Sequence, residues 1–270
     1  MKIALFGSSK PEARQQIREI LSSLPDTVVM DGEDSFAGAD MALSIGGDGT
    51  FLRTAAQVGE SGVPILGINA GRLGFLADVA LHEAANLLPA MLTEGRYNVE
   101  YRAVLQLSIP GCCQSYQPFA LNEVAILKRD VSSMVSVSVF IDGALLNTYD
   151  ADGLAIATPT GSTAYAMSAG GPILEPRSNC FAIVPIAPHS LTTRPLVIRD
   201  GGVIDVTVKS RNNLFLVAID GLPVHLTTEY RLQITRANHN IGVVRRPDHT
   251  FFDTLRQKLM WGAGGIGEKE

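Results

Sequence analysis

Short apolar runs alternate with helical spacing through the first hundred residues. The apolar runs lie at residues 3–6, 41–45 and 64–68, and they predict buried strands. Helices are predicted from residue 11 to about residue 24, and over residues 51–58 and 82–92. Because strand–helix–strand units of this length pair their strands in parallel, we expect an α/β domain over residues 1–95.

The pattern changes near Gly95, where short β-type runs replace the helical spacing. Examples are residues 104–109, 135–141, 203–208 and 214–219. Asp142-Gly143 and Asp220-Gly221 are dipeptides typical of hairpin turns. We therefore expect an all-β domain over residues 96–244. A last helix is predicted over residues 251–259, and the segment 245–270 is expected to pack back on the first domain.

The composition argues against three classes of protein, namely disordered, nucleic-acid-binding and disulfide-stabilised proteins. Of the 270 residues 46% are hydrophobic and 18% are charged, which suffices for real cores and argues against disorder. The net charge of −5 argues against a nucleic-acid partner, because such binding relies on basic residues at phosphates. Three cysteines, an odd number, indicate no disulfide framework.

The N-terminal apolar run is shorter than the ~7 residues of a signal-peptide core. No window approaches the ~18 apolar residues of a membrane span. The sequence therefore predicts a cytoplasmic protein with no membrane partner.

The segment GGDGT at residues 46–50 is the first candidate for chemistry. A strand runs into a loop with three glycines around Asp48, and a helix follows. Glycines let the backbone approach a phosphate, and the helix N-terminus presents amides to it. A carboxylate between them suits a base that accepts a proton from a phosphoryl acceptor. The alternative is a tight strand-to-helix turn in which Asp48 only caps the helix.

A second glycine-rich stretch runs over residues 152–172, and hydroxyl side chains cluster in its middle. Small residues there would let a flat ligand lie against the backbone while hydroxyls contact ribose or base edges. The alternative is a polar, tightly packed helix start. Asn122-Glu123 is a polar pair within an apolar run, and it suits either recognition of a ribose or base edge or an ordinary strand edge.

Together these segments resemble the NAD kinase family. The resemblance rests on GGDGT at 46–50, GINAGRLGFL at 67–76, Asn122-Glu123, the stretch 152–172 and PHSL at 188–191, in this order and spacing. It implies an α/β domain plus a β-rich domain, with an active site between them. It also implies phosphoryl transfer from ATP to the 2′-hydroxyl of the adenosine ribose of NAD, with Mg²⁺ accompanying ATP. Whether polyphosphate or NADH is also used is left open.

The resemblance assigns a role to each matching residue. Asp48 is the expected catalytic base. The expected phosphate and ATP contacts are Gly46, Gly47, Gly49, Thr50 and Arg53. The expected NAD contacts are Asp48, Gly49, Phe75, Asn122, Glu123, Asp152, Thr163, Ala164, Tyr165 and Ser168. No protein ligand for the metal is assigned. The β-rich domain is expected to bind NAD and to form a homo-oligomer, a dimer or a tetramer.

One position departs from the family, and two other functions compete. After the turn Asp220-Gly221 many members have a Gln that contacts NAD, whereas this chain has Leu222. A lipid kinase of the diacylglycerol type shares the loop around Asp48 but not the second stretch. A non-catalytic nucleotide sensor would need no base at Asp48. Production of NADP from NAD and ATP discriminates among the three.

Overall fold

The structure is a computed structural model of the chain, and it describes residues 1–7, 11–31, 36–71, 74–130 and 134–260. The chain forms two compact units. Unit 1 comprises Met1–Tyr101 together with the chain from Ile241 onward, and unit 2 comprises Arg102–Asn240. Two long strands, β6 (Asn98–Ser108) and β17 (Leu232–Arg245), begin in one unit and end in the other.

Unit 1 is built on a parallel sheet with the strand order β2-β1-β3-β4. These strands are β1 (Lys2–Gly7), β2 (Val28–Asp31), β3 (Met41–Gly46) and β4 (Ile65–Asn69). Two further strands pair with β4 in parallel, namely β5 (Val79–Ala80) and the end of β17. The predicted α/β layer is thus confirmed. The strand β2 was not predicted, since it is only four residues long and lies at the sheet edge.

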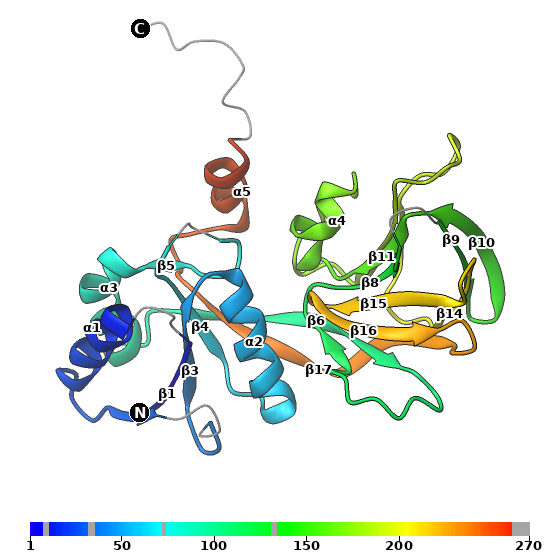
Figure 1. The fold of residues 1–270 in the computed structure, drawn as a ribbon. Helices are drawn as coiled ribbons and strands as arrows, with labels where there is room; N and C mark the ends of the chain where they lie inside the picture. Colours follow the sequence, from blue (N-terminus) through cyan, green and yellow to red (C-terminus); the bar gives the residue numbers. More distant parts are fainter. Residues whose placement is uncertain (8–10, 32–35, 72–73, 131–133, 261–270) are drawn as a thin grey trace, which may run out of the picture. The chain divides into compact units, whose positions relative to one another are not determined.

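Helices cover both faces of this sheet (Figure 1). Helices α1 (Pro11–Ser22) and α3 (Ala84–Thr93) lie together on one face, and α2 (Asp48–Val58) lies on the other. A short 3-10 turn, η2 (Leu81–Glu83), leads into α3, and another, η1 (Gly59–Ser61), follows α2. Helix α5 (Phe251–Leu259) follows β17, as its spacing predicts, and residues 261–270 after it lie outside the described residues. Helix α2 begins three residues earlier than predicted, so Asp48 is its first residue.

The apolar faces of these elements explain why they pack. Ile17 and Leu21 of α1, Leu43 of β3 and Leu88 of α3 belong to one fully buried cluster. Strands β1, β3 and β4 are buried along almost their whole length, as is usual for parallel strands covered on both faces. The polar loops at the strand ends are therefore positioned by a rigid layer.

Unit 2 consists of two antiparallel sheets, which confirms the β-rich prediction. One sheet has the order β13-β12-β11-β8-β15-β16. Its strands are β8 (Glu123–Lys128), β11 (Gly153–Ala157), β12 (Cys180–Ile186), β13 (Leu196–Arg199), β15 (Leu214–Ile219) and β16 (Leu222–Thr227). In the other, β10 (Ala144–Ala151), β9 (Val135–Ile141), β14 (Ile204–Ser210) and β17 follow one another, and β7 (Phe119–Ala120) pairs with β6.

The two sheets of unit 2 share one apolar core. Val137 and Val206 from one sheet pack in the same buried cluster as Ile156, Phe181 and Phe215 from the other. Alternating burial along β9, β14 and β15 reflects the two-residue period of half-buried strands. Between β11 and β12 lie a 3-10 turn, η3 (Gly161–Thr163), and the short helix α4 (Tyr165–Ser168).

Both predicted hairpin turns are present. Asp142 and Gly143 join β9 to β10, and Asp220 and Gly221 join β15 to β16. All four residues have positive φ values of 50°, 82°, 47° and 83°, as a two-residue hairpin loop of this type requires.

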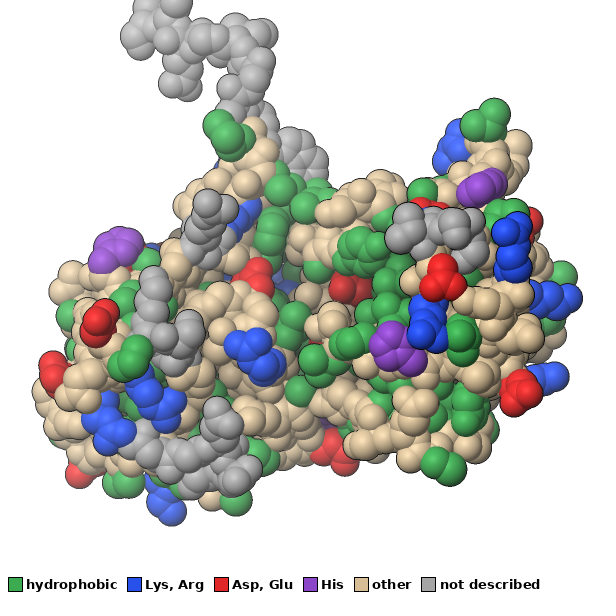
Figure 2. Space-filling model, in the orientation of Figure 1, with side chains coloured by type: hydrophobic (Ala, Val, Ile, Leu, Met, Phe, Trp, Pro, Cys, Tyr) green, Lys and Arg blue, Asp and Glu red, His purple; other side chains and the backbone are tan. Residues whose placement is uncertain are grey.

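Figure 2 shows one face of the molecule, on which Lys and Arg side chains are interspersed with Asp and Glu. Among the described helices, none has the length and apolar character needed to cross a membrane.

Candidate active site

The strand order of unit 1 points to the edge where a ligand would bind. The order β2-β1-β3-β4 reverses direction between β1 and β3, and ligands of open α/β sheets bind at the carboxyl ends of the strands at such a reversal. Strand β1 ends at Gly7 and β3 ends at Gly46. A Cβ atom at Gly7 would lie 2.3 Å from Cγ2 of Thr50, and one at Gly46 would lie 2.3 Å from Oγ1 of Thr50. Glycine at both positions therefore lets the helix start sit directly on the strand ends.

The expected phosphate-binding residues form one accessible loop and helix turn. Among the described residues, and apart from chain neighbours and the backbone of α2 itself, no heavy atom lies within 4 Å of the position of a Cβ at Gly47 or Gly49. Gly47 is the N-cap of α2 and offers no side chain to the first helical amides. These amides can therefore serve an anion. Arg53, one turn on, is exposed and donates through Nη2 to Oγ1 of Thr50 at 3.3 Å.

Asp48 is held by a loop that lies far away in sequence. Its Oδ2 accepts a hydrogen bond from the amide of Phe75 at 2.8 Å, and its Oδ1 accepts one from the amide of Leu76 at 3.1 Å. A Cβ at Gly74 would lie 1.8 Å from Oδ1 of Asp48, so the loop can approach only because residue 74 is glycine. The structure thus brings together Asp48 and Phe75, two residues that the sequence singled out. Arg72 and Leu73 of the same loop lie outside the described residues.

These contacts leave Asp48 able to act on a ligand. Each carboxylate oxygen has two lone pairs, and the loop amides use one on each oxygen.

A cation from the C-terminal helix α5 also interacts with the carboxylate of Asp48. Burial lowers the pKa of Lys258, and the negative charge of Asp48 acts in the opposite direction. The sequence does not predict a role for Lys258, since nothing in the spacing of α5 indicates that its charge acts on Asp48.

In unit 2 the Asn122-Glu123 pair lies against the second glycine-rich stretch. The backbone oxygen of Asn122 accepts a hydrogen bond from the amide of Thr158 at 2.9 Å. The hydroxyl of Thr158 donates to the backbone oxygen of Leu121 at 2.6 Å. A Cβ at Gly161 would lie 2.1 Å from the Asn122 oxygen, so the turn packs directly on this strand start. Residues almost forty positions apart therefore form one surface.

Glu123 is buried with unmet hydrogen-bonding capacity. Burial, and secondarily the charge of Asp220, raise the pKa of Glu123 to about 7, although a backbone hydrogen bond from Tyr165 acts to lower it. Within the described chain, Oε2 of Glu123 and Oγ1 of Thr160 are buried and have no hydrogen-bond partner. Buried polar atoms are normally paired, and an unpaired acceptor beside a small-residue turn suits a ligand that donates a hydroxyl or amino hydrogen.

Asp220 fixes the start of β8, a role that its turn dipeptide does not predict. Its carboxylate accepts hydrogen bonds from the amides of Leu121 at 2.8 Å, Asn122 at 2.8 Å and Glu123 at 3.1 Å. Burial outweighs these donors and raises the pKa of Asp220. The dipeptide Asp220-Gly221 predicts the turn and its positive φ values. That the carboxylate of Asp220 meets the start of β8 follows only from the sheet order, in which β15 lies beside β8.

The remaining predicted NAD contacts divide into two places. Thr163 and Ala164 are half-buried, whereas Ser168 is exposed and Tyr165 is 40% exposed. Thr163 lies on η3, Tyr165 and Ser168 lie on α4, and Ala164 joins the two. Asp152 lies instead at the opposite end of β11, where its carboxylate pairs with Lys128 at 2.6 Å. It lines a separate pocket of about 440 Å³ in unit 2 with basic residues that include Lys209 and Arg211. Asp152 is therefore not brought next to Glu123 within the chain, and its contact with NAD stays a prediction.

In the part of the chain that the structure describes, no three His, Cys, Asp or Glu side chains gather into a candidate metal cluster.

Comparisons with known proteins agree with the arrangement of both units. Residues 10–97 match the family model of the ATP-NAD kinase N-terminal domain, and residues 121–246 match that of the ATP-NAD kinase C-terminal domain. An NAD kinase of Bacteroides fragilis is 56% identical over 225 residues, covering 83% of this chain and 77% of that protein. One from Porphyromonas gingivalis is 48% identical over the same share of each chain.

Solved structures show the same fold. An NAD kinase from Archaeoglobus fulgidus in complex with ATP aligns with a TM-score of 0.80 and 28% identity, covering 99% of this chain and all of that one. A yeast NADH kinase complexed with NADH aligns with a TM-score of 0.86 over 100% of this chain and 90% of its own, at 23% identity. The family models and the identity to these relatives establish that this chain belongs to the ATP-NAD kinase family, a family of kinase enzymes.

Proposed function

We propose that this protein transfers the γ-phosphoryl group of ATP to the 2′-hydroxyl of the adenosine ribose of NAD, giving NADP and ADP. The observation that carries the proposal is the position of Asp48. Its carboxylate stands at the first residue of α2, beside the open glycine loop, and two backbone amides fix its orientation. A helix that only needed a cap would not require a second loop to hold the carboxylate.

Asp48 acts as the base in this proposal. The oxygen of the 2′-hydroxyl forms a bond to the γ-phosphorus, the bond from that phosphorus to the β–γ bridging oxygen breaks, and ADP leaves. The hydroxyl proton passes to the carboxylate of Asp48. Phosphoryl transfer depends mainly on positioning and charge stabilisation, so the fixed carboxylate and the open amides of Gly47 and Gly49 match the needs of the reaction.

The phosphate donor is assigned to the loop of unit 1. An ATP complex of the Archaeoglobus relative supports ATP as the donor. Gly46, Gly47, Gly49 and Thr50 would contact the triphosphate, and the exposed Arg53 would add positive charge beside it. Mg²⁺ would arrive with ATP as part of the substrate, held mainly by phosphate oxygens and water.

In unit 1 the proposed NAD contacts are Asp48 and Phe75. In unit 2 the proposed contacts are Asn122, Glu123 and the turn and short helix after β11. The unpaired oxygen of Glu123 would accept a hydrogen bond from a ribose hydroxyl or an adenine amino group. The half-exposed ring of Tyr165 would pack on a ring of NAD, next to Thr163, Ala164 and Ser168.

We further propose a cytoplasmic homo-oligomer whose β-rich units form the contact. Strand β13 is the edge of its sheet, and its residues Leu196 and Val197 are exposed by 37% and 43%. An apolar sheet edge needs a cover, and a symmetric contact with a second copy is the commonest solution. Light scattering at micromolar protein concentration tests this, and a particle of one chain's mass, 28.8 kDa, would contradict it.

The test of the function is direct. The purified protein is incubated with NAD and Mg-ATP, and NADP is measured with an NADP-specific dehydrogenase. A lipid kinase would give no NADP and would instead phosphorylate diacylglycerol. A nucleotide sensor would bind NAD without turnover. Parallel reactions with NADH and with inorganic polyphosphate establish which acceptors and donors are used.

A further inference from the structure

A single peptide group of the Phe75 loop is held from both sides. The carbonyl oxygen of Phe75 accepts a hydrogen bond from Nη2 of Arg245 at 2.8 Å. The amide of Leu76, which belongs to the same peptide group, donates to Oδ1 of Asp48 at 3.1 Å. A trans peptide is planar, with its carbonyl and its N–H pointing in opposite directions. A side chain that fixes the carbonyl of Phe75 therefore also fixes the direction of the N–H that meets Asp48.

Arg245 is itself locked in place at the end of β17. Its side chain is only 10% exposed, and it faces two carboxylates. Nη1 lies 3.6 Å from Oδ1 of Asp78, and Nε lies 3.8 Å from Oε2 of Glu100. The planar guanidinium can therefore direct one nitrogen at a carboxylate and another at the Phe75 carbonyl, which the single nitrogen of a lysine cannot do.

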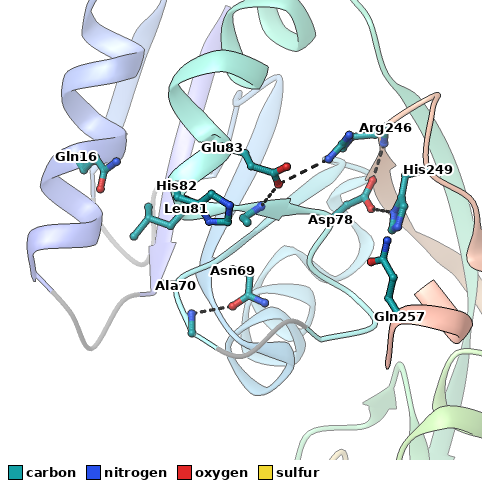
Figure 3. Close-up of a pocket in the computed structure, with 12 residues that line it drawn as sticks. Gln16, Asn69, Ala70, Asp78, Leu81, His82, Glu83, Arg246, His249 and Gln257 are labelled. Carbon is teal, nitrogen blue, oxygen red and sulfur yellow. Dashed lines mark hydrogen bonds and ion pairs between the residues drawn. The ribbon is translucent and has the colours of Figure 1, made fainter. Parts of the chain in front are cut away.

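Asp78 joins this arrangement to the chain after β17, as its contacts with Arg246 and His249 show (Figure 3). Its side chain is fully buried, and Oδ2 accepts a hydrogen bond from the amide of Arg246 at 2.7 Å. Oδ1 lies 2.6 Å from Nδ1 of His249. A buried carboxylate is tolerated only where such partners satisfy it, so Asp78 ties the chain after β17 to the strand that follows the Phe75 loop.

We infer that Arg245 is a positioning residue for Asp48, acting through the peptide group between Phe75 and Leu76, and that Asp78 holds Arg245 in this role. The inference rests on the proposed function, since it assigns Asp48 to the reaction. Neither Arg245 nor Asp78 needs to touch NAD or ATP for this effect. Loss of Arg245 would free the loop, and Asp48 would lose the orientation that the reaction requires.

The first test compares two arginine variants. Arg245→Met should lower kcat about tenfold to a hundredfold with small changes in KM for NAD and ATP, because misplacement of a catalytic group by about 1 Å costs this much. Arg245→Lys should recover only part of kcat. The matched control is Arg236→Met, since Arg236 is also a partly buried arginine that pairs with a carboxylate, that of Asp200 in unit 2. This control should keep wild-type kcat.

The second test observes the loop itself. Hydrogen exchange of the Phe75 and Leu76 amides should become faster in Arg245→Met and should stay unchanged in Arg236→Met. This measurement requires no turnover, so it tests the hold on the loop even if the wild-type protein makes no NADP. A wild-type protein that makes no NADP would contradict the proposed function, and with it the link between Arg245 and catalysis.

The third test asks whether Arg245 acts through Asp48. The double variant Asp48→Asn with Arg245→Met should be no slower than Asp48→Asn alone, because the carboxylate that Arg245 positions is already gone. Additive losses would overturn the inference, as would full kcat and unchanged exchange in a folded Arg245→Met. If Arg245→Met does not fold, the same comparisons are made with Arg245→Lys.

Discussion

Each unit contributes one carboxylate to the proposed ligand contacts, and the two carboxylates differ in their burial and in their hydrogen-bond partners. Asp48 in unit 1 accepts hydrogen bonds from two amides, and its charge acts on the cation Lys258. Glu123 in unit 2 is buried and lies near a second carboxylate, that of Asp220, and one of its oxygens has no hydrogen-bond partner among the described residues. The first arrangement favours a base whose orientation is fixed before a ligand arrives. The second favours a group whose charge and hydrogen bonds are completed only when a ligand arrives.

The surroundings of Asp48 and of the Asn122-Glu123 pair nevertheless each depend on a glycine in the loop that packs against them. Gly74 leaves room for the carboxylate of Asp48, and Gly161 leaves room for the backbone of Asn122. Neither glycine has a positive φ, so both are required for close approach rather than for their backbone conformation. A substitution at either position therefore tests the close approach itself, without adding backbone strain.

The largest expected effect is at Asp48. Asp48→Asn should reduce kcat by about a hundredfold or more, the range for loss of a positioned base, while NAD and ATP still bind. Asparagine keeps the side-chain shape and can still accept from one loop amide. Steady-state kinetics together with calorimetric titration of NAD separates turnover from binding. Turnover close to that of the wild type would remove Asp48 from the role of base.

Gly74→Ala should come next, because it displaces the same carboxylate without changing its chemistry. The added Cβ would lie 1.8 Å from Oδ1 of Asp48, so either the loop or the carboxylate must move. We expect kcat to fall by about tenfold to a hundredfold. Gly201→Ala is the matched control, since no heavy atom of the described chain beyond its own neighbours lies within 4 Å of its Cβ position. If both variants keep full kcat, the contact between the loop and Asp48 has no catalytic importance.

Glu123 predicts a dependence of stability on pH. The pKa of Glu123 is raised to about 7, so the folded protein keeps this proton at pH values where the unfolded chain has lost it. The stability of the ligand-free protein should therefore fall as the pH rises from about 4.5 to 7, by roughly 1–3 kcal/mol. Glu123→Gln should show a shallower decline, with the remainder due to groups such as Asp220, whose pKa is also raised.

Thermal unfolding of the wild type and Glu123→Gln at pH 5 and pH 8 checks this. Between pH 5 and pH 8 the variant should lose less stability than the wild type does. Parallel curves for both proteins would show that Glu123 is not protonated near neutral pH.

The smallest effect is expected at Tyr165. Tyr165→Ala should weaken NAD binding about tenfold or less, the range of one aromatic contact, and should leave ATP binding unchanged. The ring is 40% exposed, so its removal leaves no cavity in the core. Calorimetry with each nucleotide measures the difference. Unchanged affinity for NAD in a folded variant would separate this helix from the NAD site.

The sequence by itself determined the elements and much of the local chemistry. Periodicity in residues 1–95 predicts a parallel α/β layer because strands and helices differ in their apolar period, and both hairpin turns follow from their Asp-Gly dipeptides. The phosphate loop is equally local. Its glycines, Asp48 and the helix start are neighbours in the chain, so their chemistry is readable before any fold is known.

Tertiary structure alone decided how distant residues serve these local motifs. The contact of Asp48 with the Phe75 loop spans 27 residues, and that of Arg245 with the same loop spans 170. The anchoring of Asn122 by Asp220 spans 98 residues, and it depends on β15 lying beside β8. No periodicity encodes these pairings, because they follow from strand order and register. For the same physical reason, the burial that raises the pKa of Glu123 to about 7 emerges only once the two sheets and the small-residue turn are packed together.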